Sequence, residues 1–498
     1  MFDYDVTIIG GGPAGFAAAM RAVNLGKRTL LIEKNELGGY SIYNGALSTK
    51  TLWEISLRFV LSSGSNNGFF SKESTPDFHS IWAQKKAATF EKTERLQKQI
   101  DYLVNHHYLT FKKGAASLVD KHTIQVNSET FSSQFIILAT GSRPRQLPNI
   151  QVDEKHIFTS DGIENIEDFP TSLVILGAGV IGCEYATIFS NFGKTRVSLI
   201  DKQDQILPFE DDDIVSHVRQ NFEQRGVRIH HHSSLIRMEV IDGLVEYEIQ
   251  LNNGQTEIHR VEKALISVGR VPNLEHIGLE NAGVELDERG YILDNDCRTS
   301  VSNIFAVGDI TADVALVNVA ELEGRHAVEK AFGMDVQCIS YNNISSIMFL
   351  RPEVAAVGLN EKQAKAKKIP YRVAIIDYKL VSRAIAMRRT NGLFKVLVSD
   401  DEKMSILGMR VVGPHASSTI QAVSVLIHLQ QGVRAIAETV HAHPSMPEGI
   451  QECARVLLGT SVLNTDMLGP LVQCFRVDSH GRHTELNQIS PNKNILKI

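Results

Sequence analysis

The sequence predicts an α/β fold, and three observations support this prediction. Two stretches, 5–34 and 172–202, each read as a strand, a glycine-rich turn, a helix and a second strand. The C-terminal part, from about residue 341, opens with strand patterns, closes with an apolar helix and has no such glycine-rich turn. The chain of 498 residues is long enough for roughly two to four domains.

The composition excludes several classes of protein. A hydrophobic content of 43% is ordinary for a globular protein, and the net charge of −6 gives no basic surface for nucleic acid. No stretch approaches the ~18 apolar residues that a membrane span needs. The first strand pattern starts near Tyr4, too early for a signal peptide before it, so we expect a cytoplasmic protein. The five cysteines form no CxxC or CxxxxC pair, so we expect neither a zinc site nor a local redox pair.

The first β-α-β unit carries a complete dinucleotide-binding pattern. Its glycines allow a tight turn, the approach of a pyrophosphate and close packing of the helix on the strand. The N-terminus of the helix favours phosphate. Glu33 ends the second strand 18 residues after Gly15, near the spacing of ~20 for an acid that binds a ribose hydroxyl. The candidate cofactor-binding residues here are Gly10, Gly12, Pro13, Ala14, Gly15 and Glu33.

The second β-α-β unit repeats the pattern with Gly177, Gly179, Gly182 and Asp201. Asp201 follows the last of these glycines by 19 residues. An acid at this place favours the free 2′-hydroxyl of NAD(H) and repels a 2′-phosphate, although the neighbouring Lys202 leaves NADP(H) open. Two complete patterns in one chain indicate two bound nucleotides.

Other segments supply further elements. Residues 75–107 predict a long surface helix or a helical pair, and helices are also predicted over 319–332 and 417–430. The polar, strand-like run 226–266 has hairpin signals at 242–243 and 253–254. It contains the histidine tract 230–232, whose side chains would alternate between the faces of a strand and could not converge on a metal.

Outside the two β-α-β units, a set of short motifs resembles one family. The frame L-G-G-x-x-x-x-x-G-x-x-x-x-K at 37–50 is similar to the active-site segment of the pyridine nucleotide-disulfide oxidoreductases. This is the family of dihydrolipoamide dehydrogenase, glutathione reductase and mercuric reductase. Further matches are A-T-G-S-R-P at 139–144, I-F-A-V-G-D at 304–309 and H-P-S-M-P-E at 443–448. The resemblance covers about residues 3–460.

The resemblance implies two Rossmann-like dinucleotide-binding domains plus a C-terminal α+β interface, or dimerisation, domain. The expected boundaries are an FAD-binding domain at 1–148 and 273–340, an NAD(P)-binding domain at 149–272, a dimerisation domain at 341–460 and a tail at 461–498. The implied cofactors are FAD and NAD(H), and two chains would pair as a homodimer. Further candidate cofactor contacts are Gly39, Thr140, Gly141, Gly269, Gly308 and Asp309.

The resemblance also implies four catalytic candidates. Lys50 would pair with Glu184 and place a fixed cation beside the flavin, where it stabilises the anionic reduced ring. His443 and Glu448 would come from the partner subunit as an acid–base pair. They either protonate an acceptor such as a quinone or form a hydrogen bond that only stabilises the interface.

The chain departs from the family at two positions. Where the family has two cysteines that form a redox disulfide, this sequence has Ser41 and Ala46. A serine hydroxyl forms no S–S bond, and alanine has no functional group, so reduction of lipoamide or glutathione by the family's mechanism is excluded. The tail holds Cys474 alone and offers no second pair.

These features favour an FAD-dependent NAD(P)H oxidoreductase that passes electrons from the flavin directly to a small-molecule acceptor. The acceptor is a second nicotinamide nucleotide, as in the soluble transhydrogenases, or a quinone, as in a diaphorase. The alternative is a catalytically degenerate dihydrolipoamide dehydrogenase homologue that acts as a nucleotide-binding or interaction protein. Service in a keto-acid dehydrogenase complex requires a dithiol and is the least supported hypothesis.

Overall fold

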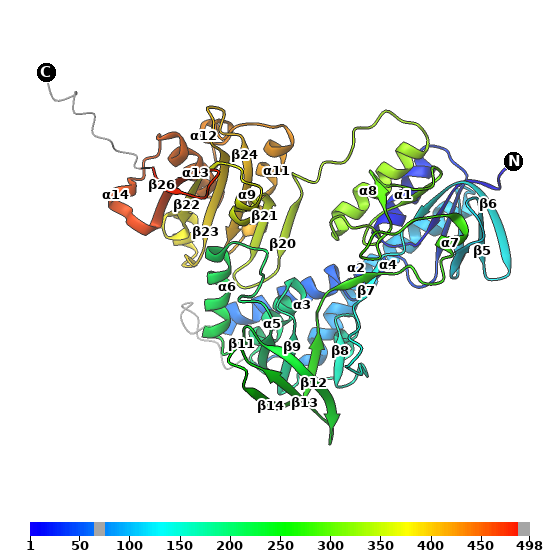
Figure 1. Cartoon of the computed structure of the whole chain (residues 1–498), viewed down its shortest axis with the longest axis horizontal. Helices are drawn as coiled ribbons and strands as arrows, with labels where there is room; N and C mark the ends of the chain where they lie inside the picture. The colour runs from blue at the N-terminus through cyan, green and yellow to red at the C-terminus, as the bar shows by residue number, and fades with distance from the viewer. Residues whose placement is uncertain (64–74, 487–498) are drawn as a thin grey trace. The chain divides into compact units, whose positions relative to one another are not determined.

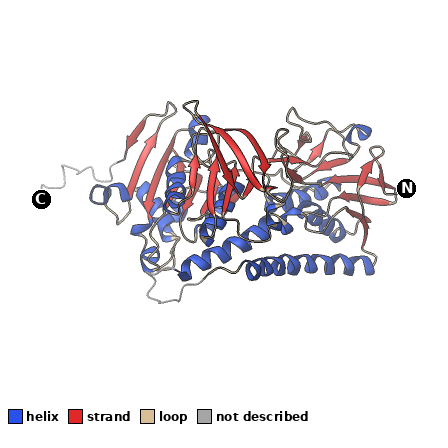
Figure 2. Ribbon diagram, turned by 90° about the horizontal axis from the view of Figure 1, so that it is seen from below, coloured by secondary structure: helices blue, strands red, loops and turns tan. Residues whose placement is uncertain are grey.

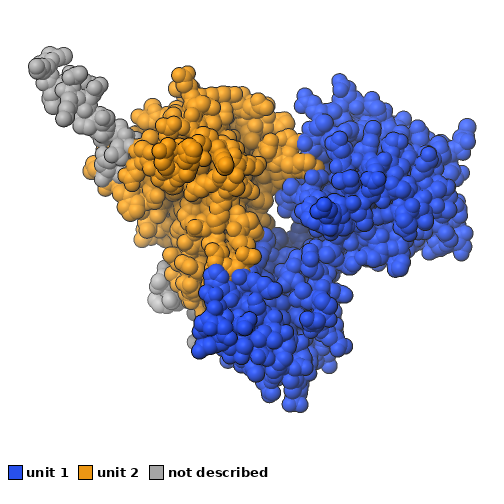
Figure 3. Space-filling model, viewed as in Figure 1, with its two compact units in different colours: residues 1–202, 232–339 blue, residues 203–231, 340–498 orange. Residues whose placement is uncertain are grey.

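The computed structural model describes residues 1–63 and 75–486 and divides into two compact units (Figures 1 and 3). Unit 1 comprises residues 1–202 and 232–339. Unit 2 comprises residues 203–231 and the chain from residue 340 onward. Residues 203–231 lie in sequence within the predicted domain 149–272, yet they group with the C-terminal part of the chain.

The first sheet of unit 1 has a parallel centre in the order β19-β6-β1-β2-β3, as the first β-α-β pattern predicts. Its strands are β1 (Tyr4–Ile9), β2 (Thr29–Glu33), β3 (Leu109–Lys113), β6 (Glu129–Leu138) and β19 (Ile304–Ala306), with β4 (Ala116–Leu118), β5 (Thr123–Val126), β17 (Asp294–Asn295) and β18 (Arg298–Thr299) at its margins. Helix α1 (Pro13–Asn24) buries a stripe of alanines against it. The small side chains let α8 (Val317–Ala331) approach so closely that a Cβ on Gly324 would meet the Ala14 carbonyl oxygen at 2.1 Å.

The second sheet of unit 1 is parallel in the order β10-β9-β15-β8. Its elements are β8 (Ile157–Thr159), β9 (Ser172–Leu176), α5 (Val180–Phe192), β10 (Arg196–Ile200) and β15 (Lys263–Ile266). An antiparallel sheet of β12 (Ser234–Ile241), β13 (Leu244–Gln250) and β14 (Thr256–Val261) lies between β10 and β15 in sequence. Asp242 and Gly243 both have positive φ in the two-residue turn from β12 to β13, so the predicted hairpin is confirmed.

Two longer helices of unit 1 lie between β2 and β3 in sequence. They are α3 (Ala46–Ser63) and α4 (Phe78–Asn105), and Figure 2 shows one helix much longer than the others lying outside the sheets. Helix α4 is one helix rather than a pair, and Asp77 caps it by accepting a hydrogen bond from the Ser80 N–H. Its inner face departs from the predicted surface helix because Trp82 and Lys85 are buried. The other short elements of unit 1 are α2 (Tyr40–Tyr43), β7 (Ser142–Pro144), η1 (Ile163–Asn165), β16 (Arg270–Pro272) and α7 (Leu279–Ala282).

Unit 2 is built on an antiparallel sheet in the order β20-β21-β24-β23-β22-β25-β26. Its elements are α6 (Asp212–Gln224), β11 (Arg228–His230), β20 (Ser345–Met348), β21 (Val354–Gly358), α9 (Glu361–Ala366), β22 (Tyr371–Asp377), η2 (Tyr378–Leu380), α10 (Ser382–Ala386), β23 (Leu393–Ser399), β24 (Ile406–Val412), η3 (Ala416–Ser418), α11 (Gln421–His428), α12 (Arg434–Glu438), α13 (Glu448–Leu458), α14 (Thr465–Leu468), η4 (Gly469–Leu471), β25 (Val472–Val477) and β26 (His483–Glu485). The predicted helix over 417–430 is therefore shorter and follows a 3₁₀ turn.

The tail, for which the sequence predicted no structure, adds to this sheet. Strand β25 pairs with β22 along its length, and β26 pairs with β25. Val472 and Cys474 are buried while Gln473 between them is exposed, which places one face of β25 in the core of unit 2. The last part of the predicted tail, 487–498, lies outside the described residues.

Buried ion pairs attach residues 203–231 to the rest of unit 2. The Lys395 ammonium is fully buried and lies 2.9 Å from Asp211, 2.8 Å from Asp213 and 2.6 Å from Glu361. Burial lowers the pKa of Lys395, but the three carboxylates outweigh burial and hold this pKa above its usual value. A lysine so placed stays charged and fixes the start of α6 on the sheet.

The histidine tract corrects one prediction. Only His230 belongs to a strand, while His231 and His232 form the turn that follows it. Within residues 1–63 and 75–486 there is no group of three or more His, Cys, Asp or Glu side chains that could hold a metal ion. In the same part of the chain no helix is both long and apolar enough to cross a membrane.

Candidate functional site

In the first glycine loop, residues 10–15, two glycines leave no room for a side chain and a third faces open space. A Cβ on Gly10 would lie 2.2 Å from the Ala139 carbonyl oxygen, and one on Gly15 would lie 1.8 Å from the Gly10 carbonyl oxygen. A Cβ on Gly12 would meet nothing within 4 Å. Gly12 is also the N-cap of α1, with no side-chain cap, and Pro13 occupies the first turn. The open space and the uncapped N–H groups suit a phosphate group.

Glu33 lies beside this loop at the end of β2. One carboxylate oxygen accepts a hydrogen bond from the Gly11 N–H at 2.6 Å, and the other accepts one from the Asn35 N–H at 2.6 Å. A carboxylate has about four acceptor positions, so the two backbone bonds leave capacity for a ribose hydroxyl. The structure thus brings together Glu33 and the glycines that the sequence singled out.

The second glycine loop repeats this geometry. A Cβ on Gly177 would lie 2.6 Å from the Ser267 carbonyl oxygen, one on Gly182 would lie 2.0 Å from the Gly177 carbonyl oxygen, and one on Gly179 would meet nothing within 4 Å. Asp201 accepts a hydrogen bond from the Ala178 N–H at 2.6 Å, just as Glu33 does in the first loop. The two loops are equivalent in construction, and both present an open N-terminal helix end.

The remaining cofactor candidates lie on loops that are tied to one another. Asp309 accepts a hydrogen bond from the Ser142 hydroxyl at 2.6 Å. The Thr140 hydroxyl donates to the Asn273 carbonyl at 2.7 Å, and the Asn273 N–H donates to the Gly141 carbonyl at 2.8 Å. Gly39 and Gly269, like Gly308, have positive φ. These bonds fix the turn after β19 beside the turn after β6.

Sequence reasoning missed two polar residues of this region. Glu323, on α8, is buried and accepts a hydrogen bond from the Gly308 N–H at 2.6 Å, which holds α8 to the turn of Asp309. Arg270 donates to Ser142 at 2.8 Å and to Asp161 at 2.9 Å. Their partners lie 15 and more than 100 residues away in sequence, so no local pattern marks them.

Lys50 and Glu184 are in contact. Lys50 lies on α3 and Glu184 on α5, and the ammonium nitrogen is 2.7 Å from the carboxylate. The Lys50 side chain is 28% exposed and that of Glu184 only 6%. The Lys50 ammonium also lies 3.3 Å from the Thr49 hydroxyl. The pair therefore presents a positive charge whose position is set by the packing of two helices.

The two positions where the sequence frame has no cysteine lie just before this pair. Ser41 is in α2 and donates a hydrogen bond to the Gly38 carbonyl at 2.7 Å, and Ala46 is the first residue of α3. The cysteines at other positions are Cys183, Cys297, Cys338, Cys453 and Cys474, all of them free thiols. Burial raises the pKa of the Cys183 thiol and that of Cys474, the latter to about 11, so neither is a thiolate at neutral pH.

His443 and Glu448 are also in contact, within unit 2. The His443 Nδ1 lies 2.7 Å from one Glu448 oxygen, and the other oxygen accepts a hydrogen bond from the Ser445 N–H at 2.7 Å. The His443 side chain is 67% exposed. Partial burial raises the pKa of Glu448, but the bonds from His443 and Ser445 outweigh burial and hold it below its usual value.

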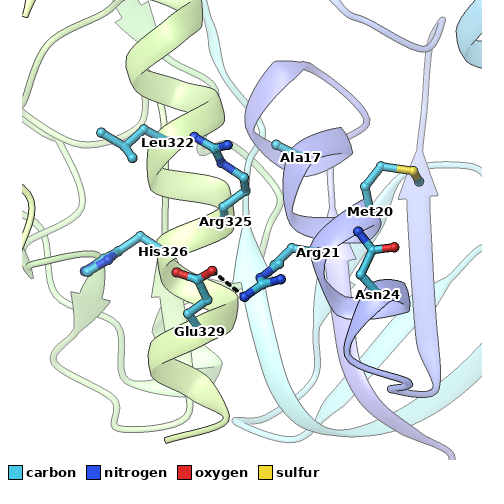
Figure 4. A pocket seen from close by; sticks show the side chains of 8 residues that line it. All are labelled: Ala17, Met20, Arg21, Asn24, Leu322, Arg325, His326 and Glu329. Carbon is cyan, nitrogen blue, oxygen red and sulfur yellow. Dashed lines mark ion pairs between the residues drawn. The ribbon is translucent and has the colours of Figure 1, made fainter. Parts of the chain in front are cut away.

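A pocket of about 460 Å³ opens between α1 and α8 (Figure 4). Its walls are Ala17, Met20, Arg21, Asn24, Leu322, Arg325, His326 and Glu329. An ion pair of 2.7 Å from Arg21 to Glu329 spans it. None of the site residues expected from the sequence lines this pocket. It is therefore distinct from the Lys50–Glu184 pair and from the open glycine loops.

The chain matches known families along most of its length. Residues 4–324 match the family model described as pyridine nucleotide-disulphide oxidoreductase, and residues 344–454 match the one described as its dimerisation domain. Dihydrolipoyl dehydrogenase of Geobacillus stearothermophilus is 33% identical over 466 residues, which is 92% of this chain and 97% of that protein. Dihydrolipoyl dehydrogenase of Chlamydia muridarum is 34% identical over 469 residues, again 92% and 97%.

Solved structures of similar fold also match the chain. The crystal structure of LpdA from Mycobacterium tuberculosis superposes with a TM-score of 0.83 at 27% identity and covers 91% of this chain and 99% of that one. The HOCl-induced flavoprotein disulfide reductase RclA from Escherichia coli gives a TM-score of 0.80 at 24% identity and covers 91% and 100%. The second likeness is one of fold alone.

Proposed function

The chain belongs to the pyridine nucleotide-disulphide oxidoreductase family, whose members use FAD and NAD(H), and we propose that it delivers electrons to an acceptor other than a disulfide. The observation that supports this proposal is the pairing of Lys50 with Glu184, next to a segment that has Ser41 and Ala46 where the resemblance places the family's two cysteines. The site keeps its fixed cation and lacks the sulfur atoms.

The residues present fit both nucleotides. In each glycine loop the residue at the helix start, Gly12 or Gly179, faces open space where a side chain would block a pyrophosphate. Glu33 would hold the ribose of FAD and Asp201 that of NAD(H). When bound, FAD would supply hydride uptake from NAD(P)H and electron transfer to a second acceptor.

Lys50 is proposed to stabilise negative charge at the flavin site. Glu184 orients the ammonium and is itself shielded from water, so the cation needs little rearrangement when charge develops nearby. The low exposure of the pair also strengthens the electrostatic interaction relative to one in bulk water.

Neither Ser41 nor Ala46 can take the part of a dithiol. The Ser41 hydroxyl is bonded to a backbone carbonyl, and Ala46 offers only a methyl group. The acceptor must then take electrons from the flavin itself, and we propose a second nicotinamide nucleotide or a quinone. We further propose that two chains pair through residues 344–454, and that His443 and Glu448 serve the partner subunit's site.

Anaerobic stopped-flow spectroscopy of the yellow holoprotein tests this function. We expect NADH to bleach the visible flavin absorbance without a thiolate-to-flavin charge-transfer band, and a quinone or a thio-analogue of NADP to restore it. The control is the double variant Ser41→Cys/Ala46→Cys, which restores the dithiol and with it the charge-transfer band and lipoamide turnover. Lipoamide turnover by the natural chain would refute the proposal.

The same replacement of both cysteines also favours a second candidate, a degenerate homologue that binds nucleotides without turnover. In that case NADH would bind with ordinary affinity and no acceptor would be reduced. The acceptor screen described above separates the two functions.

A further inference from the structure

A buried ion pair lies behind the Lys50–Glu184 contact. The Glu164 carboxylate, on η1, lies 3.0 Å from the Lys85 ammonium on α4, and both side chains are almost completely shielded from solvent. The Trp82 indole N–H donates to the Glu164 backbone carbonyl at 2.9 Å. Nothing in the nucleotide or redox chemistry described above uses these groups.

The Glu164 carboxylate also accepts hydrogen bonds from the two helices that carry Lys50 and Glu184. One of its oxygens accepts hydrogen bonds from the Ser48 hydroxyl at 2.6 Å and from the Tyr185 hydroxyl at 3.2 Å. Ser48 precedes Lys50 by two residues on α3, and Tyr185 directly follows Glu184 on α5. One carboxylate thus joins α3, α4 and α5 at the turns where Lys50 and Glu184 stand.

The Lys50–Glu184 contact and the Glu164 bonds to Ser48 and Tyr185 lie on neighbouring residues of α3 and α5. Together they constrain the two helices more than either contact does alone. A single bond between Lys50 and Glu184 fixes only one point on each helix and by itself opposes rotation about the helix axis weakly. Ser48 faces the interior on another side of α3 from Lys50, so its bond to Glu164 opposes that rotation. Burial raises the pKa of Glu164, and Lys85, Ser48 and Tyr185 offset the effect only in part.

We propose that the Lys85–Glu164 ion pair, acting through Ser48 and Tyr185, is a positioning element that holds the Lys50 ammonium against Glu184. It supplies from outside the active-site segment a constraint that a disulfide between residues 41 and 46 would supply from within. The proposal rests on the proposed function, because the position of Lys50 matters for catalysis only if Lys50 acts at the flavin.

The same two helices offer a matched control. About two turns beyond Lys50 and Glu184 on their helices, the Asn191 amide on α5 donates to the Ser56 hydroxyl on α3 at 2.9 Å, and both side chains are buried. This bond also joins α3 to α5, but it lies away from Lys50 in sequence. Ser56→Ala therefore removes a buried polar tie without touching the Glu164 network.

The test measures the accessibility of the Lys50 amine by competitive amine labelling and mass spectrometry on the FAD-loaded protein. Removing one partner of a buried ion pair destabilises a fold, whereas replacing both with apolar side chains is often neutral, so the main variant is Lys85→Met/Glu164→Leu. We expect labelling of Lys50 to rise about fivefold, the change that loss of a modest ion-pair contact gives. Labelling of Lys86, an exposed residue next to Lys85 on α4, should stay unchanged.

Two milder variants, Ser48→Ala and Tyr185→Phe, keep both buried charges. We expect each to raise Lys50 labelling, and Ser56→Ala to leave it unchanged. Unchanged Lys50 labelling in the double variant would overturn the inference. If the double variant fails to fold, unchanged labelling in Ser48→Ala overturns it, and an equal rise in Ser56→Ala does so as well.

Failure of the proposed function gives a different result. The rate of flavin reduction by NADH in Lys50→Met reports on the role of Lys50, whereas labelling reports on its position. A Lys50→Met variant that reduces flavin at the natural rate would refute the role and leave the labelling result intact. A normal labelling pattern in Lys85→Met/Glu164→Leu, with slow reduction in Lys50→Met, would refute the positioning alone.

Discussion

Lys50–Glu184 and His443–Glu448 are contacts of the same length, 2.7 Å, but the chain builds them differently. The first joins two packed helices from segments 134 residues apart, and a buried ion pair stands behind it. The second joins residues five apart at the start of α13, and its imidazole is largely exposed. A short contact distance alone therefore does not distinguish a charge that packed helices hold in place from a charge on an exposed local turn.

The difference teaches where each pair can act. Packing holds Lys50 in place within one chain, so its effect on bound flavin should be visible in any preparation of the holoprotein. The His443 imidazole faces solvent in the single chain, so we expect its chemistry to depend on a surface supplied by a second subunit. We therefore expect mutations of Lys50 to affect the reduction of the flavin and mutations of His443 to affect its reoxidation.

The largest effect is expected for Lys50→Met. Removing a fixed charge that stabilises a developing anion costs about 100-fold in rate, so flavin reduction by NADH should fall by that order. Stopped-flow absorbance measures the change, with Lys86→Met as the control of equal charge loss. A decrease of less than about threefold would remove the distinction between the two pairs.

The next effect concerns stability. Glu164→Leu leaves the buried Lys85 ammonium without its carboxylate and should lower the free energy of unfolding by about 3 kcal/mol. Adding Lys85→Met should recover most of this loss, because no buried charge then remains. Urea unfolding of the two variants and the natural chain checks the expectation. Equal destabilisation in the single and double variants would contradict it.

A smaller effect is expected for His443→Gln in the reductive half of the reaction. Since the pair lies on a local turn, flavin reduction by NADH should stay within about twofold of the natural rate. Reoxidation by a quinone should slow by about tenfold or more if the imidazole supplies a proton there. Separate measurement of the two half-reactions decides this. A loss confined to reduction would reverse the roles of the two pairs.

The smallest effect is the pH dependence of the second pair. Because the pKa of Glu448 in the fold is below its usual value, the contact adds stability above the usual pKa of a glutamate. That contribution is lost as the pH falls through the lowered value. Glu448→Gln should cost about 0.5 kcal/mol at neutral pH and nothing in strong acid, measured by denaturant unfolding. A cost that persists in acid would show that packing, not charge, is lost.

The sequence predicts the fold of unit 1 well because its signals are local. Glycines at fixed spacing, a strand before them and an acid after them specify a β-α-β segment within some thirty residues. Both β-α-β segments, 5–34 and 172–202, form as expected. The Lys50–Glu184 contact follows from the motif that each residue belongs to. The roles of these residues remain predictions.

Other features depend on partners that a local pattern does not show. Lys85 looks like an ordinary surface lysine in a polar helix, since its partner Glu164 is 79 residues away. Strand β25 has the alternation of a half-buried strand, but its pairing with β22 spans about a hundred residues. Residues 203–231 join unit 2 through Lys395, which no spacing links to them.

The electron capacity of the protein tests the central claim most directly. In an anaerobic dithionite titration, a flavin that works without a sulfur relay takes up one equivalent of reductant per FAD. The Ser41→Cys/Ala46→Cys variant should take up a second equivalent, since a disulfide adds another two-electron couple. An endpoint of two equivalents per FAD in the natural chain would contradict the account.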